Sequence, residues 1–205
     1  EEGSEICDMV GRAVYADSGT VNINGTVSSI KSDTDMWQGT SGFIVHLRGN
    51  AAGTLGAAAV VDNNETVSGG DGFAVLGGCT LTVEHGAVLR EFNTGNIIQI
   101  GPSDSELYFD GEITECISGG HAINAQGAGS FYVWIGPNAN IHHNVVAYGT
   151  IYAQCEGGTI DIYGKINDNI STDRGGGLTM ANNFSPTIVN MYEGAEICNN
   201  VSTQT

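Results

Sequence analysis

One pattern of about 25–30 residues returns along the chain, and this repeat constrains the fold more than any other feature. The segment EGSEICDMVG begins at Glu2, and the similar segment EGAEICNNVS begins at Glu193. A repeat of this length is typical of stacked supersecondary units, each of which leaves a hydrophobic face for its neighbour to cover. The sequence therefore predicts a solenoid, although the repeat does not name a ligand.

Each repeat contains three short apolar segments. The first alternates apolar and polar residues and runs into a glycine, as at 20–25, 80–86 and 159–164. The second places two aliphatic residues four positions apart, and the third is an apolar run that follows a glycine and one variable residue. These segments are rich in Val, Ile, Tyr and Phe, and no window shows a helical period. We predict an all-β fold, a single right-handed parallel β-helix over residues 1–205, with about seven coils of three short strands each.

The composition fits tight bends between strands. Glycine accounts for 31 of the 205 residues, about twice its usual share of roughly 7%, and glycine turns a chain sharply at positive φ. Asn144, Asn169 and Asn200 occupy one slot, directly before the second aliphatic residue of the middle segment. Stacked at a bend, they would form an asparagine ladder in which each amide bonds the backbone of the next coil. The alternative is that they only favour turns.

The third segment is expected to supply part of the core. Five aliphatic residues align within it and are expected to stack inward: Val14, Val45, Val75, Ile98 and Ile123. The residues one position earlier are also apolar, so the pattern leaves the facing of this strand open.

The charge is strongly acidic. Twenty-three acidic residues stand against six basic ones, which gives a net charge of −17. Because phosphate binding needs Lys and Arg, this balance argues against nucleic acid and anionic membranes as partners. No run of about 18 apolar residues is present, so we expect no membrane insertion by this segment. The chain starts and stops within a repeat unit, and we expect it to be a piece of a longer repeat array.

The cysteines and histidines predict neither a disulfide nor a metal site. Cys79 and Cys155 lie about three coils apart, roughly 14 Å at the strand spacing of a sheet, and a disulfide needs Cα atoms within about 7 Å. The five cysteines match no zinc motif. His142 and His143 are adjacent on an expected strand, so they would point to opposite sides and would not chelate one metal. We therefore expect free thiols, no metal and no cofactor.

The sequence offers little chemistry for catalysis. Acidic residues gather in predicted turns: Asp33 with Asp35, Asp62 with Glu65, Asp104 with Glu106, and Asp168. Acids in turns are usually solvated, and a lyase base is hard to build from six basic residues. No nucleophile elbow, phosphate loop or Cys–His nucleophile pair is present. We predict that the chain is not an enzyme and has no catalytic residues.

Aromatic residues give the candidate binding site. If Leu107 and Phe109 point inward, Tyr108 points outward, and in the next coil Tyr132 and Trp134 point outward in the same way. These three rings would form an exposed patch across two coils, and Tyr and Trp bury much area at interfaces for little loss of entropy. The alternative is that a neighbouring loop covers them.

A second candidate lies in the longest insert, residues 28–41. It carries Met36 and Trp37 in an otherwise polar loop, and an exposed Trp on a loop is a candidate for binding. The alternative is that Trp37 folds back over the edge of a coil. The candidate ligand-binding residues are therefore Tyr108, Tyr132, Trp134, Met36 and Trp37.

Several glycine- and asparagine-containing motifs resemble the right-handed parallel β-helix repeats of bacterial cell-surface proteins. They are GGHAINA at 119–125, GGGLTMANN at 175–183, INDN at 166–169 and ICNN at 197–200. They are similar to repeats of polymorphic autotransporter adhesins and of gut Gram-positive surface proteins. The chain departs from that pattern by lacking regular Phe-x-x-Asn copies. The resemblance implies export, an extracellular position at the bacterial surface and a partner from a host or a neighbouring microbe.

Two classes of function follow. The first is a non-catalytic adhesion or binding module that recognises an extracellular protein or glycan; the resemblance includes proteins that bind host immunoglobulin. The alternative is a carbohydrate-active β-helix enzyme, either a polysaccharide lyase or a glycoside hydrolase. An ice-binding solenoid fits less well, because regular Thr-x-Thr rows are missing. An enzyme needs acids and a base that converge on one face, whereas an adhesin needs only a flat or aromatic patch.

Overall fold

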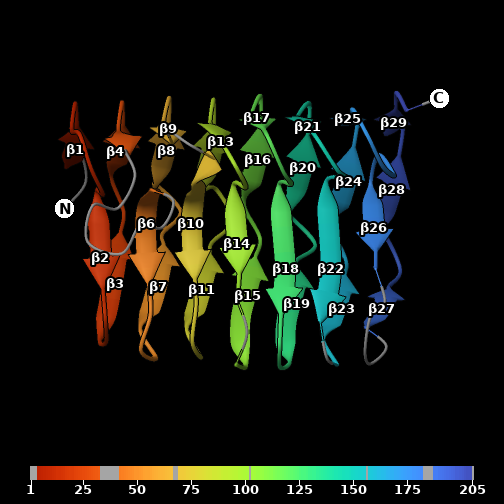
Figure 1. Cartoon of the computed structure of the whole chain (residues 1–205), viewed down its shortest axis with the longest axis horizontal. Helices are drawn as coiled ribbons and strands as arrows, with labels where there is room; N and C mark the ends of the chain where they lie inside the picture. The colour runs from red at the N-terminus through yellow and green to blue at the C-terminus, as the bar shows by residue number, and fades with distance from the viewer. Residues whose placement is uncertain are drawn as a thin grey trace.

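The computed structural model describes residues 4–32, 42–66, 69–101, 103–155, 157–181 and 187–204. Over these residues the chain forms a single parallel β-helix, whose coils follow one another along the long axis from the N-terminus to the C-terminus (Figure 1). The winding is right-handed, because the strands on the near side run downward as the chain advances to the right in this view (Figure 1). The predicted fold is therefore confirmed.

The strands build four sheets that run the length of the rod, named A to D in the order in which a coil meets them. Sheet A contains β1 (Glu5–Cys7), β4 (Thr26–Ser28), β8 (Val60–Asp62), β12 (Val88–Arg90), β16 (Glu112–Thr114), β20 (Asn140–His142), β24 (Lys165–Asn167) and β28 (Glu196–Cys198). Sheet B contains β5 (Lys31–Ser32), β9 (Glu65–Thr66), β13 (Asn93–Thr94), β17 (Ile117–Ser118), β21 (Val145–Val146), β25 (Ile170–Ser171) and β29 (Val201–Ser202).

The other two sheets carry the longer strands. Sheet C contains β2 (Val14–Ala16), β6 (Phe43–Leu47), β10 (Asp71–Val75), β14 (Ile98–Ile100), β18 (Ile123–Gly127), β22 (Ile151–Cys155) and β26 (Leu178–Met180). Sheet D contains β3 (Thr20–Ile23), β7 (Ala52–Leu55), β11 (Thr80–Val83), β15 (Ser105–Phe109), β19 (Phe131–Ile135), β23 (Thr159–Ile162) and β27 (Ile188–Met191).

A coil has four strands rather than three, because the predicted middle strand breaks in two. The residue directly after each strand of sheet A adopts a left-handed backbone with φ between 49° and 56°: Asp8, Ser29, Asn63, Glu91, Glu115, His143, Asp168 and Asn199. A single left-handed residue ends the alternation of a strand. After it, the next residue faces inward and the following aliphatic residue faces outward, so Ile117, Val145, Ile170 and Val201 form an exposed row on sheet B.

The asparagine ladder is confirmed at the bend between sheets A and B. The Oδ1 atom of Asn144 accepts the backbone N–H of Cys116 at 3.1 Å, and the Oδ1 atom of Asn169 accepts the N–H of Asn144 at 3.0 Å. The Oδ1 atom of Asn200 accepts the backbone N–H of Asn169 at 3.1 Å in the same way. Asn64, which the sequence pattern did not include, makes the equivalent bond to Ile30 at 2.9 Å. These amides replace strand pairing where the backbone turns, so the bend leaves few buried groups without partners.

The core is a continuous stack of aliphatic and aromatic side chains inside the coil. Val45, Ile98 and Ile123 belong to it, as predicted, and Val14 in the first coil is only partly buried. Val75 also belongs to the core, as predicted. Its alignment with this row is wrong by two residues, because Phe73 pairs with Val45 and Ile98, whereas Val75 pairs with Leu47 and Ile100. Strand β10 begins earlier relative to its glycine than its neighbours do, and only the pairing reveals this shift.

The residues one position earlier than this row are buried too. Ile44, Ile97 and Ala122 belong to the same core cluster. Ile97 and Ala122 lie in the bend that leads from sheet B into sheet C, directly before their strands begin. The bend turns these side chains inward. The row and the position before it are therefore both apolar because both contribute to one core, and not because they lie on opposite faces of a strand.

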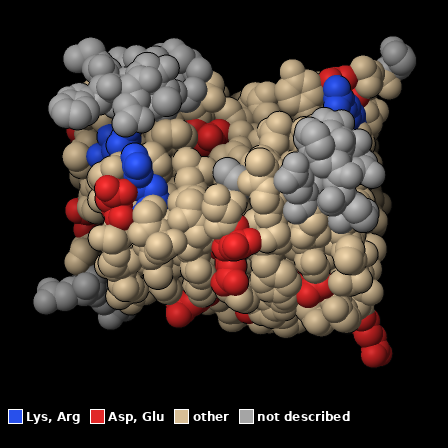
Figure 2. All heavy atoms as spheres, turned by 60° about the horizontal axis from the view of Figure 1, so that its bottom comes forward, with Lys and Arg blue, Asp and Glu red and all other residues tan. Residues whose placement is uncertain are grey.

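Acidic and basic side chains lie on different parts of the surface. The visible acidic side chains lie at separate points across one face, and the visible Lys and Arg lie toward the two ends of the rod (Figure 2).

Four of the cysteines are free thiols: Cys7, Cys79, Cys116 and Cys198. The side chain of Cys155 lies outside the described part of the chain. Among the described residues, no helix is long and apolar enough to cross a membrane.

Candidate functional site

Three of the predicted site residues lie together on the outer face of sheet D. In β15 and β19 the residues alternate between buried and partly exposed, which places Tyr108, Tyr132 and Trp134 outward as predicted. Tyr108 pairs directly with Trp134 across the two strands, with ring centroids 6.5 Å apart. The ring of Tyr132 meets that of Tyr108 edge to face at 5.7 Å. This is the tilted geometry that aromatic pairs prefer.

Two further tyrosines extend this cluster toward the C-terminus. Tyr163 follows β23 and lies 6.1 Å from Trp134, and Tyr192 follows β27 and stacks on Tyr163 at 4.1 Å with the ring planes 6° apart. We call Tyr108, Tyr132, Trp134, Tyr163 and Tyr192 the aromatic row. The sequence carried a signal for the extension, since TIDIYG and IVNMYEG each place a tyrosine between the strand and its closing glycine.

Asp161 fixes the centre of the aromatic row. Its carboxylate accepts the hydroxyl of Tyr132 at 2.9 Å, the side-chain amide of Asn190 at 2.8 Å and the hydroxyl of Tyr192 at 3.4 Å. Burial, and then the hydrogen bond to Asp161, raise the pKa of Tyr132 well above its ordinary value. The hydrogen bonds to Asp161 hold the rings of Tyr132 and Tyr192 in place without a ligand.

The aromatic row is less exposed than predicted. Tyr192 is 41% exposed, whereas Tyr108, Tyr132, Trp134 and Tyr163 are partly buried because each ring covers its neighbour. What the surface presents is a continuous series of ring edges and faces. The other two predicted site residues, Met36 and Trp37, lie outside the described residues.

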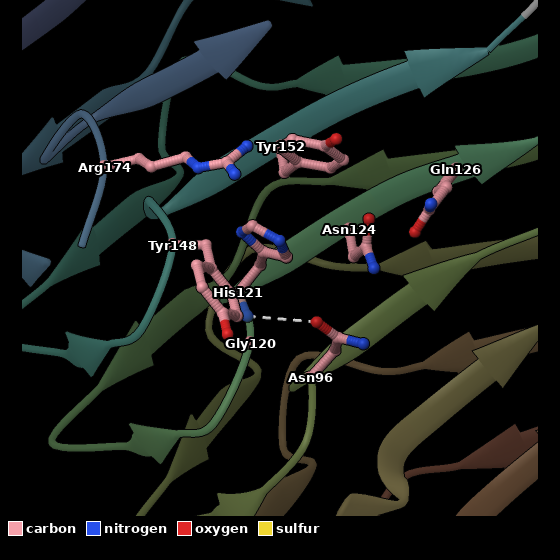
Figure 3. Close-up of a pocket in the computed structure, with 8 residues that line it drawn as sticks. All are labelled: Asn96, Gly120, His121, Asn124, Gln126, Tyr148, Tyr152 and Arg174. Atoms are coloured by element: carbon pink, nitrogen blue, oxygen red, sulfur yellow. Dashed lines mark hydrogen bonds between the residues drawn. The ribbon is translucent and has the colours of Figure 1, made fainter. Parts of the chain in front are cut away.

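A second site, which sequence reasoning missed, is a groove on the outer face of sheet C. It has a volume of about 320 Å³ and is lined by Asn96, Gly120, His121, Asn124, Gln126, Tyr148, Tyr152 and Arg174 (Figure 3). Asn124 and Gln126 project from β18 and Tyr152 from β22. The others come from bends: Asn96 from the bend before β14, Gly120 and His121 from the bend before β18, Tyr148 from the bend before β22, and Arg174 from the bend after β25. These positions are distant in sequence and meet only through the register of Asn124 with Tyr152.

Hydrogen bonds hold the groove in shape. The carboxylate of Asp71 accepts the backbone N–H of Asn96 at 2.9 Å and its side-chain amide at 2.8 Å. The Oδ1 atom of Asn96 then accepts the backbone N–H of His121 at 3.0 Å (Figure 3). Burial raises the pKa of Asp71 to about 6, although these two hydrogen bonds oppose the shift.

Three of the acids that the sequence offered for catalysis have local partners, whereas Asp33 and Asp35 lie outside the described residues. Asp62 pairs with Arg90 at 3.1 Å, and Glu65 pairs with Lys31 at 3.5 Å. The carboxylate of Glu106 accepts the hydroxyl of Tyr108 at 3.2 Å. None of these three carboxylates belongs to the lining of the groove.

The prediction that His142 and His143 point to opposite sides is wrong. Their Nδ1 atoms lie 2.5 Å apart, and the Nε2 atom of His142 lies 2.6 Å from the carboxylate of Glu112. His143 has a φ of 54°, so it ends the strand and its side chain leaves the alternation. Even so, no cluster of three or more His, Cys, Asp or Glu among the described residues has the arrangement that would hold a metal.

No protein-family model, curated protein or solved structure matches this chain. The geometry of the aromatic row and of the groove is therefore what points to a function for this chain.

Proposed function

We propose that this chain is a non-catalytic adhesion module of a bacterial cell surface, and that it binds an extracellular protein or glycan through the aromatic row. One observation carries the proposal: five aromatic side chains form an unbroken series of ring contacts along sheet D, from β15 and β19 to the bends after β23 and β27. The core accounts for the inward residues of these strands, but it does not require outward aromatic ones.

The rigidity of the aromatic row supports a binding role. Interfaces concentrate their binding energy in a few Tyr, Trp and Arg residues, and rings that are fixed before binding lose little entropy. Asp161 holds Tyr132 and Tyr192 by their hydroxyls, and Trp134 packs between Tyr108 and Tyr163. The same rings offer flat apolar faces to a sugar or to a protein side chain.

The arrangement of the acids supports a non-catalytic reading. A glycosidase of the usual kind needs two carboxylates on opposite sides of one bond, about 5–10 Å apart, and facing the same cleft. Asp62, Glu65 and Glu106 are each engaged with a neighbouring side chain, in strands of sheets A, B and D respectively. The carbohydrate-active alternative would need its acids and base on one face.

The proposal also covers the kind of partner and the location of the chain. An acidic module with few basic residues suits an extracellular ligand better than a nucleic acid or an anionic membrane. Host immunoglobulin is one protein of this class, and surface glycans of host or microbe are the other.

The test is binding by the isolated chain to a glycan array and to serum immunoglobulin. For the ligand found, the double variant Tyr132→Ala/Trp134→Ala should weaken binding at least about thirtyfold, because loss of an interface anchor costs about 2 kcal/mol or more. Tyr15→Ala, which removes an exposed tyrosine of sheet C, is the matched control and should leave binding unchanged.

The outcomes separate the alternatives. If the double variant binds as tightly as the parent and has the same melting temperature, the aromatic row is not the site. In that case Trp37→Ala tests the insert. Depolymerisation of pectin, alginate or a mucin glycan by the purified chain would replace the adhesin proposal with the enzyme alternative.

A further inference from the structure

The groove on sheet C has a floor of aromatic rings. His121 stacks on Tyr152 with centroids 4.6 Å apart and ring planes 16° apart, and Tyr148 lies 5.9 Å from His121 at 45° (Figure 3). His121 and Tyr152 are buried, whereas Tyr148 is 43% exposed. The stacked pair of His121 and Tyr152 and the side wall of Tyr148 therefore line the groove and can contact a ligand. Such a surface favours the flat apolar face of a ring.

The orientation of His121 fixes the chemistry of its free nitrogen. The Nδ1 atom lies 2.9 Å from the carbonyl oxygen of Gly149, so Nδ1 carries the proton and donates it. Burial, and then the charge of Arg174, lower the pKa of His121, while the bond to Gly149 opposes that shift. The ring is therefore neutral near pH 7, and Nε2 keeps a lone pair that makes no hydrogen bond to the described residues. The groove thus offers an acceptor for a hydroxyl donor.

Asn124 adds an amide whose oxygen lacks a partner among the described residues. The residue is 6% exposed, and its Oδ1 atom has no hydrogen-bond partner among the described residues. A buried polar atom without a partner costs about 1–3 kcal/mol, and such atoms in native proteins call for an explanation. The amide lies between Tyr152 and Gln126 in the lining of the groove (Figure 3). A hydroxylated ligand would satisfy it.

Arg174 supplies a positive charge at one side of the groove. Its guanidinium carbon lies 6.0 Å from the centre of the Tyr148 ring. Its Nε atom lies 3.8 Å from the carboxylate of Asp173. Other basic side chains have closer acids: Lys31, Arg48, Arg90 and Lys165 lie 2.9–3.5 Å from theirs. Arginine with donors to spare favours a carboxylate, which it meets through two parallel hydrogen bonds.

We propose that this groove binds a carboxylate-bearing sugar residue, with the pyranose ring on the aromatic floor, the carboxylate on Arg174, and hydroxyls on His121 Nε2 and the Asn124 amide. The volume of about 320 Å³ lies at the lower end of the range for small-molecule sites, roughly 300–1,000 Å³, and suits one or two sugar rings. A bare phosphate would use Arg174 but would leave the aromatic floor uncovered and bring no hydroxyl donor to His121. This site goes beyond the proposed function, because it lies on a different sheet from the aromatic row.

The test uses methyl glucuronide, methyl galacturonide and methyl sialoside as probes, with methyl glucoside and methyl galactoside as neutral controls. Binding is followed by titration in two-dimensional NMR, with the His121 ring signals as reporter. We expect at least one acidic probe to bind at least tenfold tighter than its neutral counterpart and to shift the His121 signals. Arg174→Gln should remove most of that preference, because the charge-assisted pair is lost. Arg90→Gln, which removes an arginine of sheet A, is the control and should leave binding unchanged.

Each outcome decides the proposal. Equal binding of acidic and neutral sugars, no binding of any acidic probe, or an unchanged preference in Arg174→Gln would each overturn it. Inorganic phosphate that competes as strongly as the sugars would overturn it as well, because the site would then recognise only an anion. The double variant Tyr132→Ala/Trp134→Ala should bind the acidic sugar normally. Failure of the groove therefore leaves the aromatic row untouched, and failure of the aromatic row leaves the groove untouched.

Discussion

The asparagine ladder allows a stability prediction to be worked out from the structure. Asn144 is fully buried and makes bonds to two neighbouring coils. Its Oδ1 atom accepts the N–H of Cys116 at 3.1 Å, and its amide donates to the carbonyl of Ile113 and to Asn169, each at 3.0 Å. The change Asn144→Ala removes all of these bonds. The bond from its own backbone N–H to Asn169 is kept.

The expected cost has two parts. The N–H of Cys116 is left buried without a partner, which costs about 1–3 kcal/mol, and the lost amide leaves a small void that adds about 1 kcal/mol. The free energy of unfolding should therefore fall by about 2–4 kcal/mol, a large share of the roughly 5–15 kcal/mol that holds a typical domain together.

Urea unfolding followed by circular dichroism measures this change as a shift of the midpoint at constant slope. Asn138→Ala is the matched control from the same coil. Its amide donates to Asp110 at 2.9 Å on the exposed surface, so its loss should cost less than about 1 kcal/mol. If the two variants lose the same stability, the ladder is ordinary turn chemistry and the reasoning is wrong.

Three further predictions concern the core, the groove and the thiols. Ile98→Asp places an unpaired charge in the core and should lower the free energy of unfolding by about 4 kcal/mol or more, seen as a sharply lower melting temperature; an unchanged one would place Ile98 outside. Because burial raises the pKa of Asp71 from 3.8 to about 6, the folded state binds its proton more tightly, so stability should fall as pH rises from about 4 to about 6. Asp71→Asn keeps an acceptor for Asn96 and should flatten that slope in urea unfolding across this range; an unaltered slope would contradict the assignment. Burial raises the pKa of Cys116 to about 12, so a thiol reagent should not modify Cys116 in the native protein. The denatured protein should titrate five free thiols, and a count of three or fewer would be incompatible with the coil spacing.

The strands and their facing were largely predictable in sheet D. Leu107 and Phe109 alternate with Tyr108, and a strand with one buried face transmits that alternation directly to the structure. The same rule gave Tyr132 and Trp134. It failed at His142 and His143, because a single left-handed residue breaks the period of two without leaving a clear mark in the sequence. Residues of many types occupy that position, from Asp8 and Ser29 to His143.

The register of strand pairing between coils determined features that the hydrophobic pattern of the sequence could not predict. The position of Gly72, which lies inside β10, suggested that Val75 would join the row of Val45 and Ile98, but the ladder pairs Phe73 with both. A shift of two residues keeps the same face inward, so the hydrophobic pattern cannot detect it. The groove depends on the same kind of information, since Asn124 and Tyr152 become neighbours only through pairing between coils.

The sequence by itself determined the architecture, because a period of about 25–30 residues with short strands and glycine bends buries its apolar side chains only by stacking coils. It also determined the outward position of Tyr108, Tyr132 and Trp134, since alternation is a local property of the chain. The tertiary structure decided the fourth sheet, the exposure of Ile117 and Val145 beyond the left-handed bend, and the meeting of His121, Tyr152 and Arg174 in one groove. These features depend on how each coil lies on the next, and no single repeat contains that information.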